Sequence, residues 1–152
     1  MHFLNLIKQI SNDKQILMCV DMDGVITSYD AGKPLDFLNK RPLTENIKKL
    51  EQISKLPNVE LKILSICRKN SQIEEKNIWL DKNAPFFKKE NRVIISKENV
   101  TNKKSYELKI DYLKSINTTK QIILVDDDNL IINKVLENLK HIIVFQDSEL
   151  ID

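Results

Sequence analysis

The sequence predicts an α/β fold, with a five-stranded, mainly parallel sheet covered by helices on both faces. The first observation is a set of five short apolar runs, rich in Ile, Val and Leu, as strands buried on both faces are. The second is that segments with helical spacing alternate with these runs, which is typical of parallel sheets. Together they indicate a three-layer, Rossmann-like architecture. The runs are Ile16–Val20, Val59–Ser65, Val93–Ser96, Gln121–Val125 and His141–Phe145.

Helical segments precede and separate the predicted strands. The first, MHFLNLIKQISND, has the spacing of a short amphipathic helix and lacks the basic start of a signal peptide. Pro42 and Pro57 bound the next, from Leu43 to Leu56, because proline suits a helix start and disrupts a helix interior. The remaining helices are predicted around Ile73–Leu80, Tyr106–Ile116 and Leu130–Leu139.

Length and composition predict one soluble globular domain over residues 1–152. Hydrophobic residues make up 41% and charged residues 30%, and the net charge of +2 is too small to indicate nucleic acid as a partner. No run approaches the ~18 apolar residues of a membrane span. The two cysteines have no metal-site or disulfide spacing, which suits a reducing compartment, so we expect a cytoplasmic protein.

One stretch departs from this even charge balance. Residues 82–109 contain eight Lys or Arg against three Glu. A charged run of this kind is commonly a solvated surface. It also suits a positive rim that attracts a phosphorylated ligand.

Polar and charged residues gather at the ends of the predicted strands. Asp21 and Asp23 follow the first strand, Ser65 ends the second, and three aspartates, residues 126–128, follow the fourth. Ligands of parallel sheets bind beyond the carboxyl ends of the strands, so we expect these side chains to meet. Aspartates at such close range repel one another unless a cation lies among them. All-oxygen ligation favours a hard ion such as Mg²⁺.

The order of these residues resembles the four motifs of the haloacid dehalogenase superfamily of phosphotransferases. DMDGV resembles the first motif, with Val25 where Thr is commonest, and ILS at Ser65 resembles the second. A lysine at 103 or 104 resembles the third, and VDDDN resembles the fourth. The similarity spans residues 16 to 128 and implies a haloacid dehalogenase-like fold.

The resemblance implies a phosphomonoesterase that uses Mg²⁺ and an aspartyl-phosphate intermediate. Asp21 would be the nucleophile, and Asp23 would protonate the leaving oxygen and then activate water. Mg²⁺ would be held by Asp21, by the backbone carbonyl of Asp23, and by Asp126 and Asp127. One of the carboxylates could instead cap the following helix, and Asp128 or Asn129 is the expected cap.

Ser65 and one lysine would hold the phosphoryl group. Lys104 is the first choice for the lysine and Lys103 the next. Lys109, one turn into the following helix, could reach inward instead. For Ser65 the alternative is an ordinary loop serine.

The resemblance also bears on substrate class. Enzymes of this superfamily often choose substrates with a cap domain, but the stretches around Ser65 leave no room for one. We therefore expect a capless enzyme with at most a small flap from residues 26–42. Such an open site suits a macromolecular or bulky phosphorylated substrate, or a small one enclosed by a partner copy in a homo-oligomer. Neither a membrane nor nucleic acid is indicated as a partner.

Two alternative functions remain open from the sequence. The segment ICRKNSQIEEKNIWLDKNAP is similar to the 5'(3')-deoxyribonucleotidase-like branch, where a Lys-x-x-Trp-Leu pattern occurs, here Lys76, Trp79 and Leu80. That branch carries a helical cap which this chain lacks room for, and Trp79 and Leu80 could simply be core residues. The other alternative is a phosphate- or metal-binding regulatory domain without turnover. Response-regulator receivers use similar groups, but in a different chain order.

Overall fold

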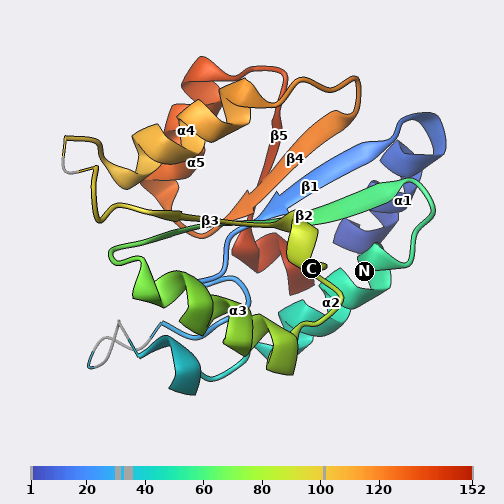
Figure 1. The fold of residues 1–152 in the computed structure, drawn as a ribbon. Coiled ribbons are helices and arrows are strands. Elements are labelled where there is room, and N and C mark those ends of the chain that lie inside the picture. The colour runs from blue at the N-terminus through green and yellow to red at the C-terminus, as the bar shows by residue number, and fades with distance from the viewer. Residues whose placement is uncertain (1, 30–31, 33–35, 101, 152) are drawn as a thin grey trace.

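A five-stranded sheet forms the centre of the computed structural model, which describes residues 2–29, 32, 36–100 and 102–151 (Figure 1). The strand order is β3-β2-β1-β4-β5, and all four pairings are parallel. This confirms the predicted α/β architecture, and the first predicted strand matches residue for residue. The strands are β1 (Ile16–Val20), β2 (Val59–Cys67), β3 (Arg92–Ser96), β4 (Gln121–Asp126) and β5 (Ile143–Gln146).

Helices cover both faces of the sheet. Helices α1, α2 and α3 lie on one face, and α4 and α5 lie on the other (Figure 1). Each helix falls where apolar spacing predicted one. Their bounds are α1 (His2–Asp13), α2 (Thr44–Ser54), α3 (Ser71–Asn83), α4 (Ser105–Ser115) and α5 (Asn129–Asn138), and three 3₁₀ turns are η1 (Phe37–Asn39), η2 (Lys89–Asn91) and η3 (Asp147–Ile151).

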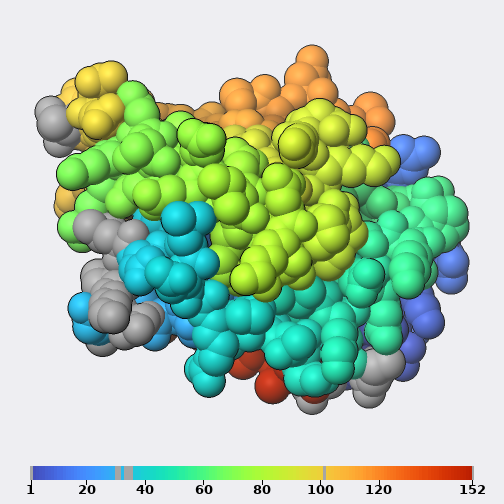
Figure 2. Space-filling model, turned by 60° about the horizontal axis from the view of Figure 1, so that its bottom comes forward, coloured from blue at the N-terminus to red at the C-terminus, as the bar shows by residue number. Residues whose placement is uncertain are grey.

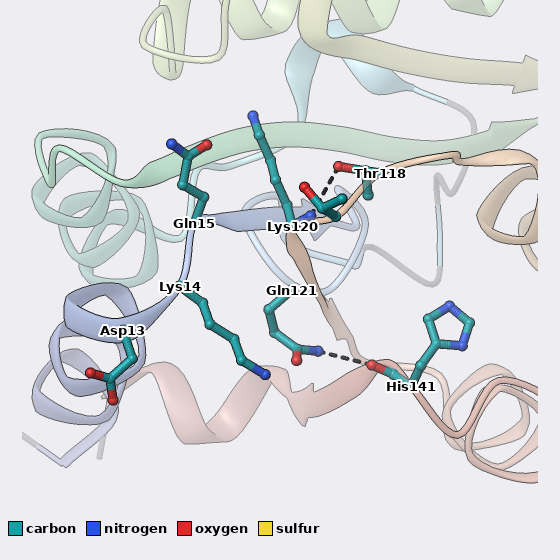
Figure 3. Close-up of a pocket in the computed structure, with 8 residues that line it drawn as sticks. Asp13, Lys14, Gln15, Thr118, Lys120, Gln121 and His141 are labelled. Atoms are coloured by element: carbon teal, nitrogen blue, oxygen red, sulfur yellow. Dashed lines mark hydrogen bonds between the residues drawn. The ribbon is translucent and has the colours of Figure 1, made fainter.

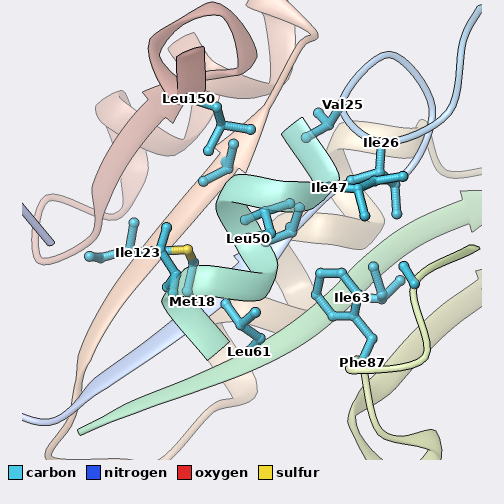
Figure 4. Close-up of a cluster of buried hydrophobic side chains, with 14 of the residues drawn as sticks. Met18, Val25, Ile26, Ile47, Leu50, Leu61, Ile63, Phe87, Ile123 and Leu150 are labelled. Atoms are coloured by element: carbon cyan, nitrogen blue, oxygen red, sulfur yellow. The ribbon is translucent and has the colours of Figure 1, made fainter. Parts of the chain in front are cut away.

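The alternation of side chains along the strands creates two hydrophobic cores. Met18 of β1 faces the core under α1 and α2, whereas Cys19 faces the core under α4 and α5. Leu50 of α2 lies over Met18 and Leu61 in the first core (Figure 4). Because β1 is buried at every position, it anchors both layers.

Two predicted strand boundaries, the end of β2 and the start of β5, differ from the structure by two residues, and three others differ by one. β2 continues past Ser65 to Cys67, because β3 pairs with it as far as Cys67↔Ser96, beyond the end of β1. Ser65 therefore lies within a strand, and Cys67 lies at the strand end. β5 begins at Ile143 rather than His141, because the backbone turns there and the Ile142 amide donates to Leu139 O at 3.1 Å.

The segment between β1 and α2 includes the predicted flap, residues 26–42. Residues 30–31 and 33–35 lie outside the described residues. The described residues of this segment contact the rest of the fold. Thr27 forms a β-bridge with Pro42, and η1 packs on α3 (Figures 1 and 2). Among the described residues, neither this segment nor the one after β2 holds a cap domain. No described helix is long and apolar enough to cross a membrane.

Candidate active site

Three carboxylates meet at the carboxyl edge of the sheet. Asp21 follows β1, and Asp126 and Asp127 lie at the end of the neighbouring strand β4. One oxygen from each lies within 4.8 Å of the others, so the group could hold a metal ion. Asp21 and Asp126 are buried and Asp127 is half-buried. We call these three residues the carboxylate triad.

Lys109 reaches the triad from α4. Its Nζ lies 3.0 Å from Asp21 Oδ1 and 2.6 Å from Asp126 Oδ2, and its side chain is 2% exposed. Burial would lower the pKa of Lys109, but the two carboxylates outweigh it and raise the pKa above its ordinary value. Lys109 is therefore a fixed positive charge between Asp21 and Asp126.

The charge balance of the triad fits a cation. Burial raises the pKa of Asp21 well above its ordinary range; Lys109 opposes the rise, while Asp126 and Asp127 add to it. Burial and Asp126 likewise raise the pKa of Asp127 to about 6. One lysine thus leaves three clustered carboxylates short of positive charge, and a cation bound by their oxygens would supply it.

Gly24 makes room for the triad. It has a φ of 82°, in the left-handed region that favours glycine. A Cβ at this position would overlap the carboxylate of Asp127. The turn after β1 therefore needs glycine both for its backbone angle and for the close approach of Asp127. Asp128 caps α5 by accepting from the Leu130 amide at 2.9 Å, which confirms the predicted cap.

Asp23 is held by two lysines rather than grouped with the triad. Its Oδ1 lies 2.8 Å from Lys40 Nζ, and its Oδ2 lies 3.1 Å from Lys76 Nζ. Burial works to raise the pKa of Asp23, but Lys76 and Lys40 together hold it below its ordinary value. The side chain of Asp23 therefore has a different electrostatic environment from that of Asp21, although only Met22 separates them.

Lys76 also contacts the predicted phosphate ligand Ser65. Its Nζ donates to Ser65 Oγ at 2.6 Å and to Ile66 O at 3.2 Å, and neither Lys76 nor Ser65 is exposed. Ser65 is thus brought to Asp23 through Lys76, while the next residue, Ile66, lines the pockets beside Asp23. A direct contact between Ser65 and phosphate stays a prediction.

Phe37 and Trp79 hold the two lysines in position. The ammonium groups of Lys40 and Lys76 lie 4.6 and 4.5 Å from the centre of the Phe37 ring. Trp79 Nε1 donates to Lys40 O at 2.8 Å. The alternative in which Trp79 and Leu80 are core residues is the one observed, since both are buried in the first core.

The three candidate lysines of the third motif occupy different environments. Lys104, the first choice, is exposed and lies at the N-terminal cap of α4, where its carbonyl accepts from Leu108. Lys103 is exposed and pairs with Asp111 at 2.6 Å. Lys109, named as the residue that could reach inward, lies at the triad, because it is on the α4 face that packs on the sheet.

Comparison with solved structures identifies the fold. A chain in the structure of the Pnkp1/Rnl/Hen1 complex superposes on 88% of this chain with a TM-score of 0.69 and 16% sequence identity. This chain spans 46% of the length of that one. The class C acid phosphatase from Bacillus anthracis, with tungstate bound, matches 96% of this chain and 78% of its own, at a TM-score of 0.50 and 14% identity.

The chain has a haloacid dehalogenase-like fold. The predicted resemblance is thus confirmed at the level of fold, in a small capless form. No family model matches the sequence, and a search of curated proteins finds no sequence match. The similarity of this chain to known proteins is therefore one of fold.

Two adjoining pockets open beside the strand ends of this haloacid dehalogenase fold. The first, which we call the triad pocket, has a volume of about 300 Å³ and is lined by Asp21, Lys109 and Asp127. The basic pocket, of about 310 Å³, is lined by Lys40, Arg68 and Lys97. Both pockets are also lined by Asp23, Tyr29, Ile66 and Ser105, which make their common wall.

A larger hollow of about 490 Å³ lies at the opposite edge of the sheet (Figure 3). Its polar lining includes Lys14, Gln121 and His141, and Gln121 Nε2 donates to His141 O at 2.9 Å. Lys120, also in the lining, is paired with Glu60 at 2.7 Å. The triad and Lys109 are both at the other edge, where ligands of this fold class bind.

Sequence reasoning missed Lys40 and Lys76 as members of the site. Lys76 had a detectable signal, because it shares the buried face of α3 with Trp79 and Leu80, and a lysine on a buried face needs a partner. Lys40 lies in an irregular segment without periodicity, so nothing in the sequence indicated its burial.

Proposed function

We propose that this chain is a Mg²⁺-dependent phosphomonoesterase that carries the phosphoryl group on Asp21. One observation supports it above the others. Asp21 lines the triad pocket, contacts Lys109 at 3.0 Å and belongs to a carboxylate triad whose charge balance fits a cation. A nucleophile, its positive partner and a metal site thus share one pocket.

Asp21, Asp126 and Asp127 would hold the ion, with the backbone carbonyl of Asp23 as a further ligand. Carboxylate oxygens favour a hard cation, and Mg²⁺ takes few protein ligands because it keeps several waters. When bound, the ion offsets the repulsion between a carboxylate nucleophile and a phosphate dianion. Its positive charge would also favour the ionised form of Asp21.

Asp21 would perform the phosphoryl transfer. A bond forms between its carboxylate oxygen and phosphorus while the bond from phosphorus to the leaving oxygen breaks. The Lys109 ammonium stabilises the ionised carboxylate and the negative charge on the phosphoryl oxygens. Water then attacks phosphorus, which releases phosphate and restores Asp21.

Asp23 would exchange protons with the leaving oxygen and then with water. Lys40 and Lys76 favour its ionised form, which is the form that accepts a proton from the attacking water. The same lysines oppose its protonation in the first step. Leaving groups that are stable as anions, such as aryl oxides, should therefore depart most readily. Ser65 would support this arrangement through Lys76, and Lys76 is thus a positioning residue.

Hydrolysis of 4-nitrophenyl phosphate tests the proposal. Turnover should require Mg²⁺, and Asp21→Asn should reduce it by about 10³-fold or more, because the nucleophile is lost. The exposed Asp111→Asn is a matched control that should retain activity. Unchanged activity in Asp21→Asn would contradict the nucleophile, and full activity in the presence of a chelator would contradict the metal.

A further inference from the structure

Part of the positive charge in the basic pocket is not neutralised by the described residues. Lys40 is 6% exposed and lies at its wall with its ammonium on Asp23, the one carboxylate among the described lining residues. Arg68 and Lys97 also line it, and neither side chain forms an ion pair or hydrogen bond within the described part of the chain. Among the described residues, the pocket therefore presents two cations without a partner.

Backbone structure holds these two cations side by side. Arg68 directly follows β2 and Lys97 directly follows β3, and the Lys97 amide donates to Cys67 O at 2.8 Å. The Arg68 amide is fixed as well, by a 2.9 Å hydrogen bond to Gln72 Oε1. The two charges are thus presented by anchored strand ends.

The acidic groups nearby do not neutralise them. Asp23 is already shared between Lys40 and Lys76. Glu98 follows Lys97, but it is exposed and does not line the pocket. The described lining therefore has a net positive charge, and an anion is the complementary ligand.

We infer that the basic pocket binds a second phosphate group, carried on the leaving group of the substrate. The two pockets share a wall at Asp23, where the leaving oxygen would lie, so a group attached to that oxygen extends toward Arg68 and Lys97. A phosphate suits them because a guanidinium donates two parallel hydrogen bonds to it and an ammonium adds a point charge. The inference rests on the proposed function, since it takes Asp21 as the site of transfer.

Calorimetric binding to Asp21→Asn, with Mg²⁺ present, tests the inference with three matched aryl phosphates. They are 4-hydroxyphenyl phosphate, 4-carboxyphenyl phosphate and benzene-1,4-diol bisphosphate. The bisphosphate should bind about 10- to 100-fold more tightly than the hydroxyl compound, as one or two charge-assisted hydrogen bonds predict. The carboxylate should lie between them, and the preference should weaken as salt is added.

Variants that remove charge test whether the preference for the bisphosphate depends on Arg68 and Lys97. Arg68→Gln combined with Lys97→Gln should reduce the preference to the roughly 2-fold expected because the bisphosphate has two equivalent ends. The control, Lys8→Gln with Lys114→Gln, removes the same charge from exposed positions outside the pocket lining and should keep the preference. Equal binding of all three compounds, or a preference that survives loss of Arg68 and Lys97, would overturn the inference.

The phosphatase proposal and the second phosphate site can be contradicted independently of each other. Hydrolysis of the same compounds by the unmodified protein reports the proposed function. If none is hydrolysed but the bisphosphate binds preferentially through Arg68 and Lys97, the anion site stands and the phosphatase proposal falls. If all are hydrolysed at equal kcat/KM, the phosphatase proposal stands and the second phosphate site is contradicted.

Discussion

At the scale of single residues, Gly24 and Lys109 determine the geometry of the carboxylate triad. Gly24 gives the turn after β1 its positive φ and leaves the space that Asp127 occupies. Lys109 supplies an ammonium group that bridges Asp21 and Asp126. Each residue can be tested against a similar residue elsewhere in the chain.

Gly24→Ala should disturb the triad through both of its constraints. The new methyl group would push Asp127 aside in a backbone conformation that alanine adopts at a cost, so we expect a loss of about 1–3 kcal/mol in unfolding free energy. Mg²⁺ affinity should fall with it, because Asp127 is displaced. Urea unfolding and Mg²⁺ titration measure the two effects. Gly32→Ala is the control, and an equal loss there would contradict the role of Gly24.

Lys109→Met and Lys104→Met distinguish the two candidate lysines. Removal of Lys109 leaves buried carboxylates without their partner, which should cost about 3–5 kcal/mol in unfolding free energy. It should also lower kcat for an aryl phosphate by about 10²- to 10³-fold, because stabilisation of negative charge is lost. Lys109→Arg keeps the charge and should retain part of the stability. A larger loss of activity in Lys104→Met than in Lys109→Met would contradict the assignment.

At the scale of elements, α3 and η1 bring the Asp23 environment together. Lys76 comes from α3, Lys40 follows η1, and the Phe37 ring of η1 lies against both ammonium groups. β2 supplies Ser65 beneath them because it extends beyond β1. These elements are far apart in the sequence, and their packing sets the ionisation of Asp23.

Lys76→Met should change leaving-group selectivity and pH dependence together. Lys76 lowers the pKa of Asp23, so its removal should raise that pKa and keep Asp23 protonated to higher pH. The rate of hydrolysis of alkyl phosphates should then rise relative to that of aryl phosphates, because the protonated carboxyl serves the leaving oxygen. The basic limb of the kcat/KM profile for alkyl phosphates should move to higher pH. Lys103→Met, which removes an exposed partner of Asp111, is the control. An unchanged aryl-to-alkyl ratio in Lys76→Met would contradict this role.

The burial of β1 leads us to expect a slow reaction of the Cys19 thiol. Cys19 is fully buried, and burial raises its pKa to about 12. In the folded protein its thiol should therefore resist iodoacetamide from pH 8 to 10, and label only as the protein unfolds in urea. Cys67 lines the basic pocket and should label faster. Peptide mass mapping measures both, and rapid labelling of Cys19 in the native protein would contradict the burial of β1.

Much of this architecture can be predicted from local sequence patterns. The strand Ile16–Val20 and the helices around it follow from apolar periodicity and proline positions. The extension of β2 was missed because its last residues gain partners only from β3, more than 20 positions later. Lys104 was preferred over Lys109 because order along the chain does not reveal which side of a helix packs on the sheet. The burial of Lys40 depends on its contacts with Trp79, Phe37 and Asp23, which sequence periodicity does not reveal.

At the scale of the whole molecule, the sheet gathers opposite charges at one edge. The triad lies at the ends of β1 and β4, whereas Arg68 and Lys97 lie at the ends of β2 and β3. Asp23 lies between the two groups and lines both pockets. This arrangement suits a metal-assisted attack on one side and an anionic leaving group on the other.

Mass spectrometry of acid-quenched protein tests the central claim most directly. With an aryl phosphate and Mg²⁺, one phosphoryl group should be found on the peptide that contains Asp21. It should be absent from Asp21→Asn and from protein treated with a chelator. Turnover with the phosphoryl group on another residue, or turnover that persists in Asp21→Asn, would contradict the account.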